Sequence, residues 1–394
     1  MPDVSAPPLK VLFVSAAGFL GGAERSLYEL LCALPEDRIA PFACVPPDGP
    51  LARQFAMAEV PVHTAPLRRF RRTLHPFMML GQIRALIQAT ATIRNLVKDL
   101  KIDVIHANTD SAALAAWEVS RETGVPFLWH CRDLRPLGQL AKMLASSSAS
   151  AIAISKAVEE HLVVQGVERN KIKRIDNGID LARFCRAEEK AVVRKSVRKS
   201  LDIDPDAPVL IDVGAWVPWK RHEYFLETLA DVREKIPGTV GLLVGSDLFQ
   251  QNSSYVKTLL ETAENLGLDR DSLKILDERE DVPELLAASD LLISASENEP
   301  FGRVLAEAGA TGVPVVAVNS GGKAEIIQDG VTGVLVPPGD EEALTQKTIA
   351  LLKTVDVREK MGLAARGWIA ERFDVRRTAR EFSELCTKVV SQRT

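Results

Sequence analysis

The chain has 394 residues, of which 46% are hydrophobic and 26% are charged, and its formal net charge is −4. This length predicts two domains with room for a core in each, and the composition is typical of a globular cytoplasmic enzyme. The acidic balance argues against nucleic acid as the principal partner, because phosphate backbones select basic faces. The five cysteines are odd in number and lack Cys-x-x-Cys spacing, so we expect reduced thiols and no zinc site.

Short apolar runs rich in strand formers alternate with segments of helical spacing. The first series of predicted strands lies near residues 10–15, 41–46, 103–107, 126–130 and 149–154. The second series lies near residues 208–213, 239–245, 273–276, 290–294 and 314–318, with helices at 223–232, 255–266 and 341–352. This alternation predicts an α/β fold with two Rossmann-like parallel-sheet halves. Ligands of such sheets bind beyond the carboxyl ends of the strands, so site residues are expected there.

A glycine-rich segment follows the first predicted strand. Gly21 and Gly22 stand just before a segment of helical spacing, and glycine lets a ligand approach the backbone closely because it has no Cβ. The segment is neither a dinucleotide-binding fingerprint nor a P-loop. An ordinary tight turn between strand and helix is the alternative.

A basic segment next to apolar residues precedes a predicted helix at 82–100. Its arginines are Arg68, Arg69, Arg71 and Arg72. Such a patch could bind an anionic membrane surface, and a solvated loop is the alternative. No secretory signal is visible and no apolar run reaches the roughly 18 to 20 residues that span a bilayer. We therefore expect a cytoplasmic protein, with peripheral attachment to the inner face of the membrane as a hypothesis.

Polar residues follow two of the predicted strands. His130 stands at the end of the strand at 126–130, although a lone histidine is more often structural. Lys220 and Arg221 lie in the loop after the strand at 208–213, where the alternative is a pair of solvated charges before a helix. Both places are at the ligand-binding end of a parallel sheet.

Two glutamates, Glu299 and Glu307, stand eight residues apart around a Pro-Phe-Gly turn that follows a buried strand. Proline suits a first helical position, so a helix is predicted to begin near Pro300. Its free amides, at about Gly302 to Val304, would form a partly positive pole for an anionic diphosphate. Helical spacing would turn both carboxylates toward one cleft, where they could accept hydrogen bonds from sugar hydroxyls. The alternative is a solvated helix face.

Together these segments resemble the retaining nucleotide-sugar glycosyltransferases of family 4, whose shared mark is the Glu-x7-Glu element. The resemblance covers nearly the full length and implies the GT-B fold, in which two Rossmann-like domains face each other across a cleft. It implies an acceptor-binding domain at 1–178, a nucleotide-sugar-binding domain at 179–374, and a last helix at 375–394 that packs back on the first domain. It also implies transfer that keeps the anomeric configuration, without metal or cofactor.

The resemblance assigns roles to the candidate residues. The catalytic ones are His130, Lys220 and Glu299. The donor-binding ones are Gly21, Gly22, Lys220, Arg221, Pro300, Phe301, Gly302, Arg303, Val304 and Glu307. The family usually has an arginine where this chain has Ala215, and whether Arg221 replaces it is open. The Asp-x-Asp pair at 202–204 is predicted to be a loop and not a metal site, because no strand leads into it.

The predicted function is transfer of a hexose from a nucleotide diphosphate sugar to a hydroxyl of a glycan or lipid-linked acceptor. Surface-polysaccharide or lipid-linked glycan assembly is the expected setting. Two alternatives stay open. One is an epimerase of nucleotide sugars on the same scaffold, since fold does not fix function. The other is a non-catalytic donor-binding subunit that supports a partner transferase.

Overall fold

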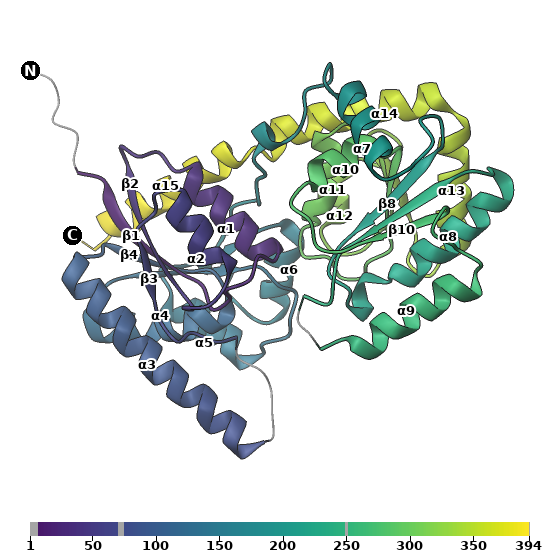
Figure 1. The fold of residues 1–394 in the computed structure, drawn as a ribbon. Coiled ribbons are helices and arrows are strands. Elements are labelled where there is room, and N and C mark those ends of the chain that lie inside the picture. Colours follow the sequence, from purple (N-terminus) through teal and green to yellow (C-terminus); the bar gives the residue numbers. More distant parts are fainter. Residues whose placement is uncertain (1–6, 70–74, 249–250, 394) are drawn as a thin grey trace, which may run out of the picture. The chain divides into compact units, whose positions relative to one another are not determined.

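The computed structural model describes residues 7–69, 75–248 and 251–393 (Figure 1). The chain divides into two compact units, residues 1–178 with 375–394 and residues 179–374. Each unit is built on one sheet whose strand pairs are all parallel within the described residues. The prediction of two parallel-sheet α/β halves is confirmed.

The first unit has a seven-stranded sheet, counted over the described residues, in the order β3-β2-β1-β4-β5-β6-β7. Its strands are β1 (Leu9–Val14), β2 (Ile39–Val45), β3 (Val62–Thr64), β4 (Val104–Ala107), β5 (Phe127–Cys131), β6 (Ser150–Ala153) and β7 (Ile172–Arg174). Its helices are α1 (Gly22–Cys32), α2 (Pro50–Met57), α3 (Pro76–Leu100), α4 (Asp110–Thr123), α5 (Gln139–Ser147), α6 (Lys156–Val164) and α15 (Val375–Ser391). The strand order reverses between β1 and β4, which is where open α/β sheets bind ligands.

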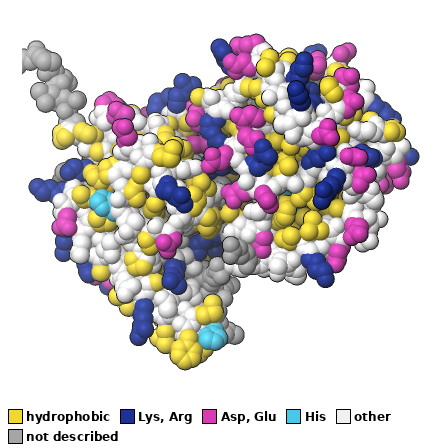
Figure 2. Space-filling view, in the orientation of Figure 1, with side chains coloured by type: hydrophobic (Ala, Val, Ile, Leu, Met, Phe, Trp, Pro, Cys, Tyr) yellow, Lys and Arg dark blue, Asp and Glu magenta, His cyan; other side chains and the backbone are white. Residues whose placement is uncertain are grey.

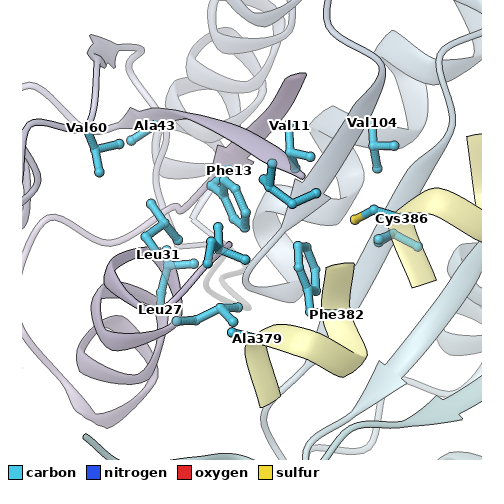
Figure 3. Close-up of a cluster of buried hydrophobic side chains, with 14 of the residues drawn as sticks. Val11, Phe13, Leu27, Leu31, Ala43, Val60, Val104, Ala379, Phe382 and Cys386 are labelled. Carbon is cyan, nitrogen blue, oxygen red and sulfur yellow. The ribbon is translucent and has the colours of Figure 1, made fainter. Parts of the chain in front are cut away.

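The last helix completes the core of the first unit (Figure 3). Ala379, Phe382 and Cys386 of α15 are buried with Phe13 of β1 and Leu27 of α1. The rings of Phe13 and Phe382 have their centroids 5.5 Å apart. Burying large apolar side chains of this kind contributes about 1.5 to 3 kcal/mol each. The C-terminal segment is therefore part of this core, although it is far from β1 in sequence.

The second unit has a six-stranded sheet, again counted over the described residues, in the order β10-β9-β8-β11-β12-β13. Its strands are β8 (Val209–Val213), β9 (Val240–Val244), β10 (Leu273–Leu276), β11 (Leu291–Ser294), β12 (Val315–Val318) and β13 (Gly333–Val336). Its helices are α7 (Lys190–Ser200), α8 (His222–Lys235), α9 (Ser253–Asn265), α10 (Val282–Ala288), α11 (Arg303–Ala310), α12 (Lys323–Ile326), α13 (Glu341–Lys353) and α14 (Val355–Arg372). Short 3-10 turns lie at Leu181–Arg183 and Pro218–Lys220 in this unit, and at Arg169–Lys171 in the first unit. The strand order reverses between β8 and β11.

The predicted helix start near Pro300 is wrong. Helix α11 begins at Arg303, and its N-cap is Gly302 with φ 95°, a left-handed conformation that favours glycine. Phe301 is buried, and its ring centroid lies 5.6 Å from that of Phe373. The turn before α11 is thus fixed by packing and by Gly302, and Glu299 lies outside the helix. Because Glu299 precedes the helix, the eight-residue spacing does not place the carboxylates of Glu299 and Glu307 on one helix face.

Candidate functional site

A largely buried ion pair joins the loops that follow β8 and β11. The Nζ of Lys220 lies 2.7 Å from the Oε2 of Glu299, and their side chains are 16% and 11% exposed. Ser296 Oγ donates to the same oxygen over 3.1 Å. Burial alone raises the pKa of Glu299, but Lys220, Lys323 and Ser296 outweigh it and hold that pKa below its ordinary value. Glu299 is therefore an ionised carboxylate, which can only accept hydrogen bonds.

The loop after β12 supports Glu299 through backbone contacts. Gly321 has φ +62°, and a Cβ added there would lie 2.1 Å from the carbonyl oxygen of Glu299. The amide of Gly322 donates to that carbonyl oxygen over 2.7 Å. Such close backbone contact requires a residue without a side chain at position 321. The place of Glu299 is set by this loop together with the end of β11.

Lys323 is a further basic residue at this edge, and the sequence prediction gave it no role. Its side chain is fully buried, and its Nζ donates to the carbonyl oxygens of Ser294 and Ser296 over 3.1 and 2.7 Å. Burial lowers the pKa of Lys323 to about 7, in spite of the attraction of Glu299. The signal in the sequence was a lysine directly after two glycines in a loop that follows a strand.

His222 fixes the loop that carries Lys220. Its Nδ1 lies 2.6 Å from the Oδ2 of Asp212, and its Nε2 lies 3.1 Å from the carbonyl oxygen of Ala215. Burial alone lowers the pKa of His222, but Asp212 and the Ala215 carbonyl outweigh it and raise that pKa. An imidazolium donates from both nitrogens, so it ties this loop to β8. The sequence prediction also missed His222, whose signal was a histidine beside the two cations.

Arg221 has carboxylate partners of its own. Its Nε and Nη2 lie 3.0 and 2.9 Å from the Oε1 of Glu297, and its Nη1 lies 3.5 Å from the Oε1 of Glu223. Ala215, which stands where the resemblance led us to expect an arginine, is half-buried. At this edge Lys220, and not Arg221, is the cation that contacts Glu299.

The start of α11 brings two more of the predicted residues together. Arg303 Nε lies 2.8 Å from the Oε1 of Glu307, and both side chains are largely buried. The amides of Leu305 and Ala306 donate to the carbonyl oxygen of Gly302, so the amides of Arg303 and Val304 come first in the helix. Pro300 is half-buried in the preceding turn. The positive pole of α11 and a held carboxylate thus lie within one helical turn.

In the first unit, the two predicted glycines lie at the start of α1. This helix begins at Gly22, directly after its N-cap Gly21. A Cβ added at Gly22 would meet no atom within 4 Å, whereas one at Gly21 would lie 2.9 Å from the Oε2 of Glu24. Burial raises the pKa of Glu24 to about 7. The backbone at Gly22 is therefore open, as close approach of a ligand requires.

His130 forms a buried hydrogen-bonded cluster with His106 and Arg132. The Nδ1 of His130 lies 2.8 Å from the Nε2 of His106 and 3.3 Å from the Nη2 of Arg132. Because a guanidinium only donates, Nδ1 of His130 must accept, and His106 must donate from Nε2. The proton of His130 is then on Nε2, which has no hydrogen-bond partner among the described residues. Burial and the charge of Arg132 lower the pKa of both histidines, so both are neutral.

Two asparagines hold Arg132. Its Nε donates to the Oδ1 of Asn108 over 2.7 Å, and its Nη1 donates to the Oδ1 of Asn177 over 2.9 Å. The Nδ2 of Asn108 donates in turn to the carbonyl oxygen of Ala23, in the first turn of α1. The glycine-rich loop and His130 thus belong to one hydrogen-bonded edge. His106 and Arg132 were missed from the sequence, although each stands at or just past the end of a predicted strand.

The predicted site residues therefore form two sets. Gly21, Gly22 and His130 lie at the carboxyl edge of the first sheet, and the other candidates lie at that of the second sheet. Over residues 7–69, 75–248 and 251–393, no group of three or more His, Cys, Asp or Glu side chains could hold a metal ion.

The chain is similar to known proteins in sequence and in fold. The family described as Glycosyltransferase Family 4 matches residues 20–183, and that described as Glycosyl transferases group 1 matches residues 193–368. The fold is similar to that in the crystal structure of Anabaena HepE in complex with UDP-glucose, with a TM-score of 0.83. The two sequences are 26% identical, and the match covers 96% of this chain and 100% of the HepE chain. The structure of sucrose-phosphate synthase of Thermosynechococcus elongatus matches with a TM-score of 0.80 over 98% of this chain and 100% of that chain. The two sequences are only 19% identical, so this similarity concerns the fold and not the function.

A curated relative is similar over part of its length. N-acetyl-alpha-D-glucosaminyl L-malate synthase of Bacillus anthracis is 30% identical over 228 residues, which are 58% of this chain and 56% of that protein. The match thus spans less than two thirds of that relative. The two family matches and the HepE structure, in contrast, extend over nearly all of this chain. The chain therefore belongs to glycosyltransferase family 4 and has the GT-B fold.

Proposed function

We propose that this protein transfers a hexose from a nucleotide diphosphate sugar to an acceptor hydroxyl, with retention and without a metal ion. The observation that carries the proposal is the buried pair of Lys220 and Glu299 beside the start of α11. A cation, a helix pole and an ionised carboxylate are the groups that a diphosphate attached to a sugar requires. The likeness to HepE, whose structure contains UDP-glucose, supports the same ligand class.

The reaction builds negative charge on the leaving diphosphate while the sugar becomes oxocarbenium-like. Groups that are aimed at this charge before the reaction lower the barrier, because they stabilise the transition state more than the ground state. We assign this role to Lys220 and to the amides of Arg303 and Val304. Glu299 would accept hydrogen bonds from the sugar hydroxyls. Glu307, held by Arg303, would accept them from the ribose.

The first unit would supply a neutral donor, His130. His130 carries a proton on Nε2 and has no charge, so its role would be to donate a hydrogen bond to a hydroxyl of the reacting sugar. The open backbone at Gly22 leaves room for the substrate beside α1.

We further propose that the acceptor is a glycan or a lipid-linked glycan, in surface-polysaccharide or lipid-linked glycan assembly. The enzyme would then work at the cytoplasmic face of a membrane. The support is the basic segment that contains Arg68 and Arg69, since anionic lipids attract such segments. Arg71 and Arg72 lie outside the described residues.

Thermal-shift measurements against a panel of nucleotide sugars, beginning with UDP-glucose, test donor binding. A specific donor at 100 times its dissociation constant adds about 2.7 kcal/mol to the free energy of unfolding. Glu307→Ala should abolish that shift, because the ribose then loses its acceptor. Glu264→Ala, at an exposed site on α9, is the matched control and should keep it. A Glu307→Ala protein that responds as strongly as the parent would exclude the ribose assignment.

A non-catalytic donor-binding subunit is the second candidate. It is favoured by Ala215 in place of the family arginine and by the engagement of Arg221 with Glu297 and Glu223. Donor binding without turnover across a panel of glycan and lipid-linked acceptors would support it. Incubation with the donor alone separates both candidates from an epimerase, which would form new sugar isomers without any acceptor.

A further inference from the structure

The beginning of α3 exposes an unusual number of large apolar side chains. The exposed fractions are 79% for Phe77, 50% for Met78 and Met79, 53% for Leu80, 41% for Ile83 and 63% for Ile87. In Figure 1 this end of α3 extends away from the rest of its unit, and Figure 2 shows apolar side chains gathered there. Contiguous exposed apolar surface of this kind usually marks an interaction site.

Four of these six apolar side chains lie on one side of the helix, and Phe77 and Met78 lie outside that arc. At about 100° per residue, Met79, Leu80, Ile83 and Ile87 fall within an arc of about 100°. Arg84 follows about 40° beyond the edge of that arc, on the same geometry. It is exposed, as is Arg68 shortly before the helix. An apolar stripe with arginine on its flank is the pattern of a helix that lies in a membrane interface.

The charge before α3 and along most of its length has one sign in the sequence. No Asp or Glu occurs between Val60 and Lys98, although the whole chain has a formal net charge of −4. The basic residues in this stretch are Arg68, Arg69, Arg71, Arg72, Arg84, Arg94 and Lys98, of which Arg94 pairs with Glu122 of α4, and Arg71 and Arg72 lie outside the described residues. The guanidinium of Arg69 lies 5.7 Å from the ring centroid of Phe19, which holds part of the segment against the unit. The region is thus suited to an anionic partner.

We propose that the beginning of α3 binds the surface of an anionic lipid bilayer. Its apolar side chains enter the headgroup region, and the arginines beside them contact lipid phosphates. A second copy of this chain fits less well, because pairing through this face brings the same positive charges together. No helix in the described part of the chain has the length and apolarity to cross a bilayer, so the contact is with the membrane surface. The inference rests on the proposed function in one respect, since a lipid-linked acceptor gives this contact its use.

Vesicle flotation of the full chain tests the proposal, with vesicles of phosphatidylcholine alone and vesicles that also contain phosphatidylglycerol. The parent should float with the anionic vesicles and much less with the neutral ones, and added salt should weaken its binding. The triple variant Met79→Gln, Leu80→Gln, Ile83→Gln should bind the anionic vesicles at least about tenfold more weakly. Glutamine keeps helical propensity, and an unchanged melting temperature checks the fold.

The matched control is the double variant Met57→Gln, Val164→Gln. These residues are 84% and 85% exposed at the ends of two other helices of the same unit. The control should float as the parent does. Equal flotation of the triple variant and the parent would overturn the proposal, as would a parent that binds neither kind of vesicle. Light scattering that shows a dimer in the parent and a monomer in the triple variant would assign the surface to a second copy instead.

Flotation needs neither donor nor acceptor, so it is independent of the transfer reaction. Glu307→Ala should lose the donor-induced thermal shift and still float, whereas the triple variant should keep the shift and stop floating. Loss of both properties in either variant would point to misfolding, and the melting temperature detects that case. A failed transfer assay and a failed lipid assay are therefore distinguishable.

Discussion

The two sheets reverse their strand order at equivalent points, between β1 and β4 and between β8 and β11, yet the residues at these points differ in kind. The edge of the second sheet carries charge pairs, with 2.7 Å between Lys220 and Glu299 and 2.8 Å between Arg303 and Glu307. The edge of the first sheet carries the neutral pair of His106 and His130, beside the buried guanidinium of Arg132, which donates to two asparagines.

This difference indicates a division of chemistry. Charged groups bind an anion and stabilise charge that develops during a reaction, whereas a neutral donor such as His130 orients a hydroxyl. A buried charge also depends on its partner, because removal of one member of a pair leaves the other uncompensated. Substitutions at the second edge should therefore affect both turnover and stability, and those at the first edge mainly turnover.

The largest expected effect is that of Lys220→Met. Loss of a cation aimed at the leaving diphosphate should lower turnover about a thousandfold, or roughly 4 kcal/mol of transition-state stabilisation. Steady-state kinetics with the donor found by thermal shift measure this. Lys257→Met, at an exposed site on α9, is the control and should leave turnover unchanged.

The double variant Lys220→Met, Glu299→Gln should be more stable than Lys220→Met, since no unpaired carboxylate remains. If the turnover of Lys220→Met falls by less than about tenfold, Lys220 does not stabilise the transition state as proposed.

At the first edge, His130→Ala should lower kcat/KM about a hundredfold, because a buried sugar hydroxyl loses its hydrogen-bond donor. His130→Gln, which can still donate, should recover part of that loss. The melting temperature should change less than in Lys220→Met. Equal activity of the Ala and Gln variants would show that the donor on Nε2 has no role.

The pH dependence gives a second check on the first edge. Burial and Arg132 hold the pKa of His130 well below 6.5, so NMR should detect no titration of this imidazole between pH 6 and 8. Arg132→Gln removes the nearby positive charge, which should raise the pKa of His130. A His130 that titrates near pH 6.5 in the parent would contradict the neutral assignment.

An intermediate effect is expected at Ala215, where the comparison can be sharpened by adding charge to the second edge. Ala215→Arg should raise turnover about tenfold, because a second cation would assist Lys220, and tenfold corresponds to about 1.4 kcal/mol. Ala215→Gln has similar length without the charge and should have no such effect. Turnover unchanged in both variants would show that the edge works with one cation, and an equal rise in both would assign the gain to size.

Much of the fold follows from local pattern, and the exceptions have physical causes. Strands such as β12 are buried on both faces, so they form apolar runs that stand out from their surroundings. The strands β3, β7 and β13 were missed because they are short and partly exposed, and at the sheet edges their apolar signal is weak. The helix start at Pro300 was mispredicted because the packing of Phe301 and the left-handed Gly302 outweigh the local preference of proline.

Single site residues could be selected from the sequence, but their partners could not. The contact of His106 with His130 depends on the register of two neighbouring strands, which composition does not fix. The contacts of Lys323 depend on a loop that is folded against the chain around Glu299, through Gly321. Motifs thus predict which residues gather at the carboxyl edges of the sheets, whereas pairing and burial, which set the charge of each group, require the folded chain.

The smallest expected effect concerns stability at the second edge. Burial lowers the pKa of Lys323 from 10.5 to about 7, so between these values the unfolded chain binds more protons than the folded one. The free energy of unfolding of the parent should therefore rise with pH above about 7, by about 1 kcal/mol per pH unit, while below pH 7 the full cost of the buried charge remains. Lys323→Met lacks this group and should show a flatter profile between pH 7.5 and 8.5, whereas Lys347→Met, exposed on α13, should follow the parent. Urea unfolding at each pH measures the free energy of unfolding of each protein. Parallel profiles for the parent and Lys323→Met would contradict the prediction. Lys323 would then keep an ordinary pKa, and the second edge would hold one more permanent charge than proposed.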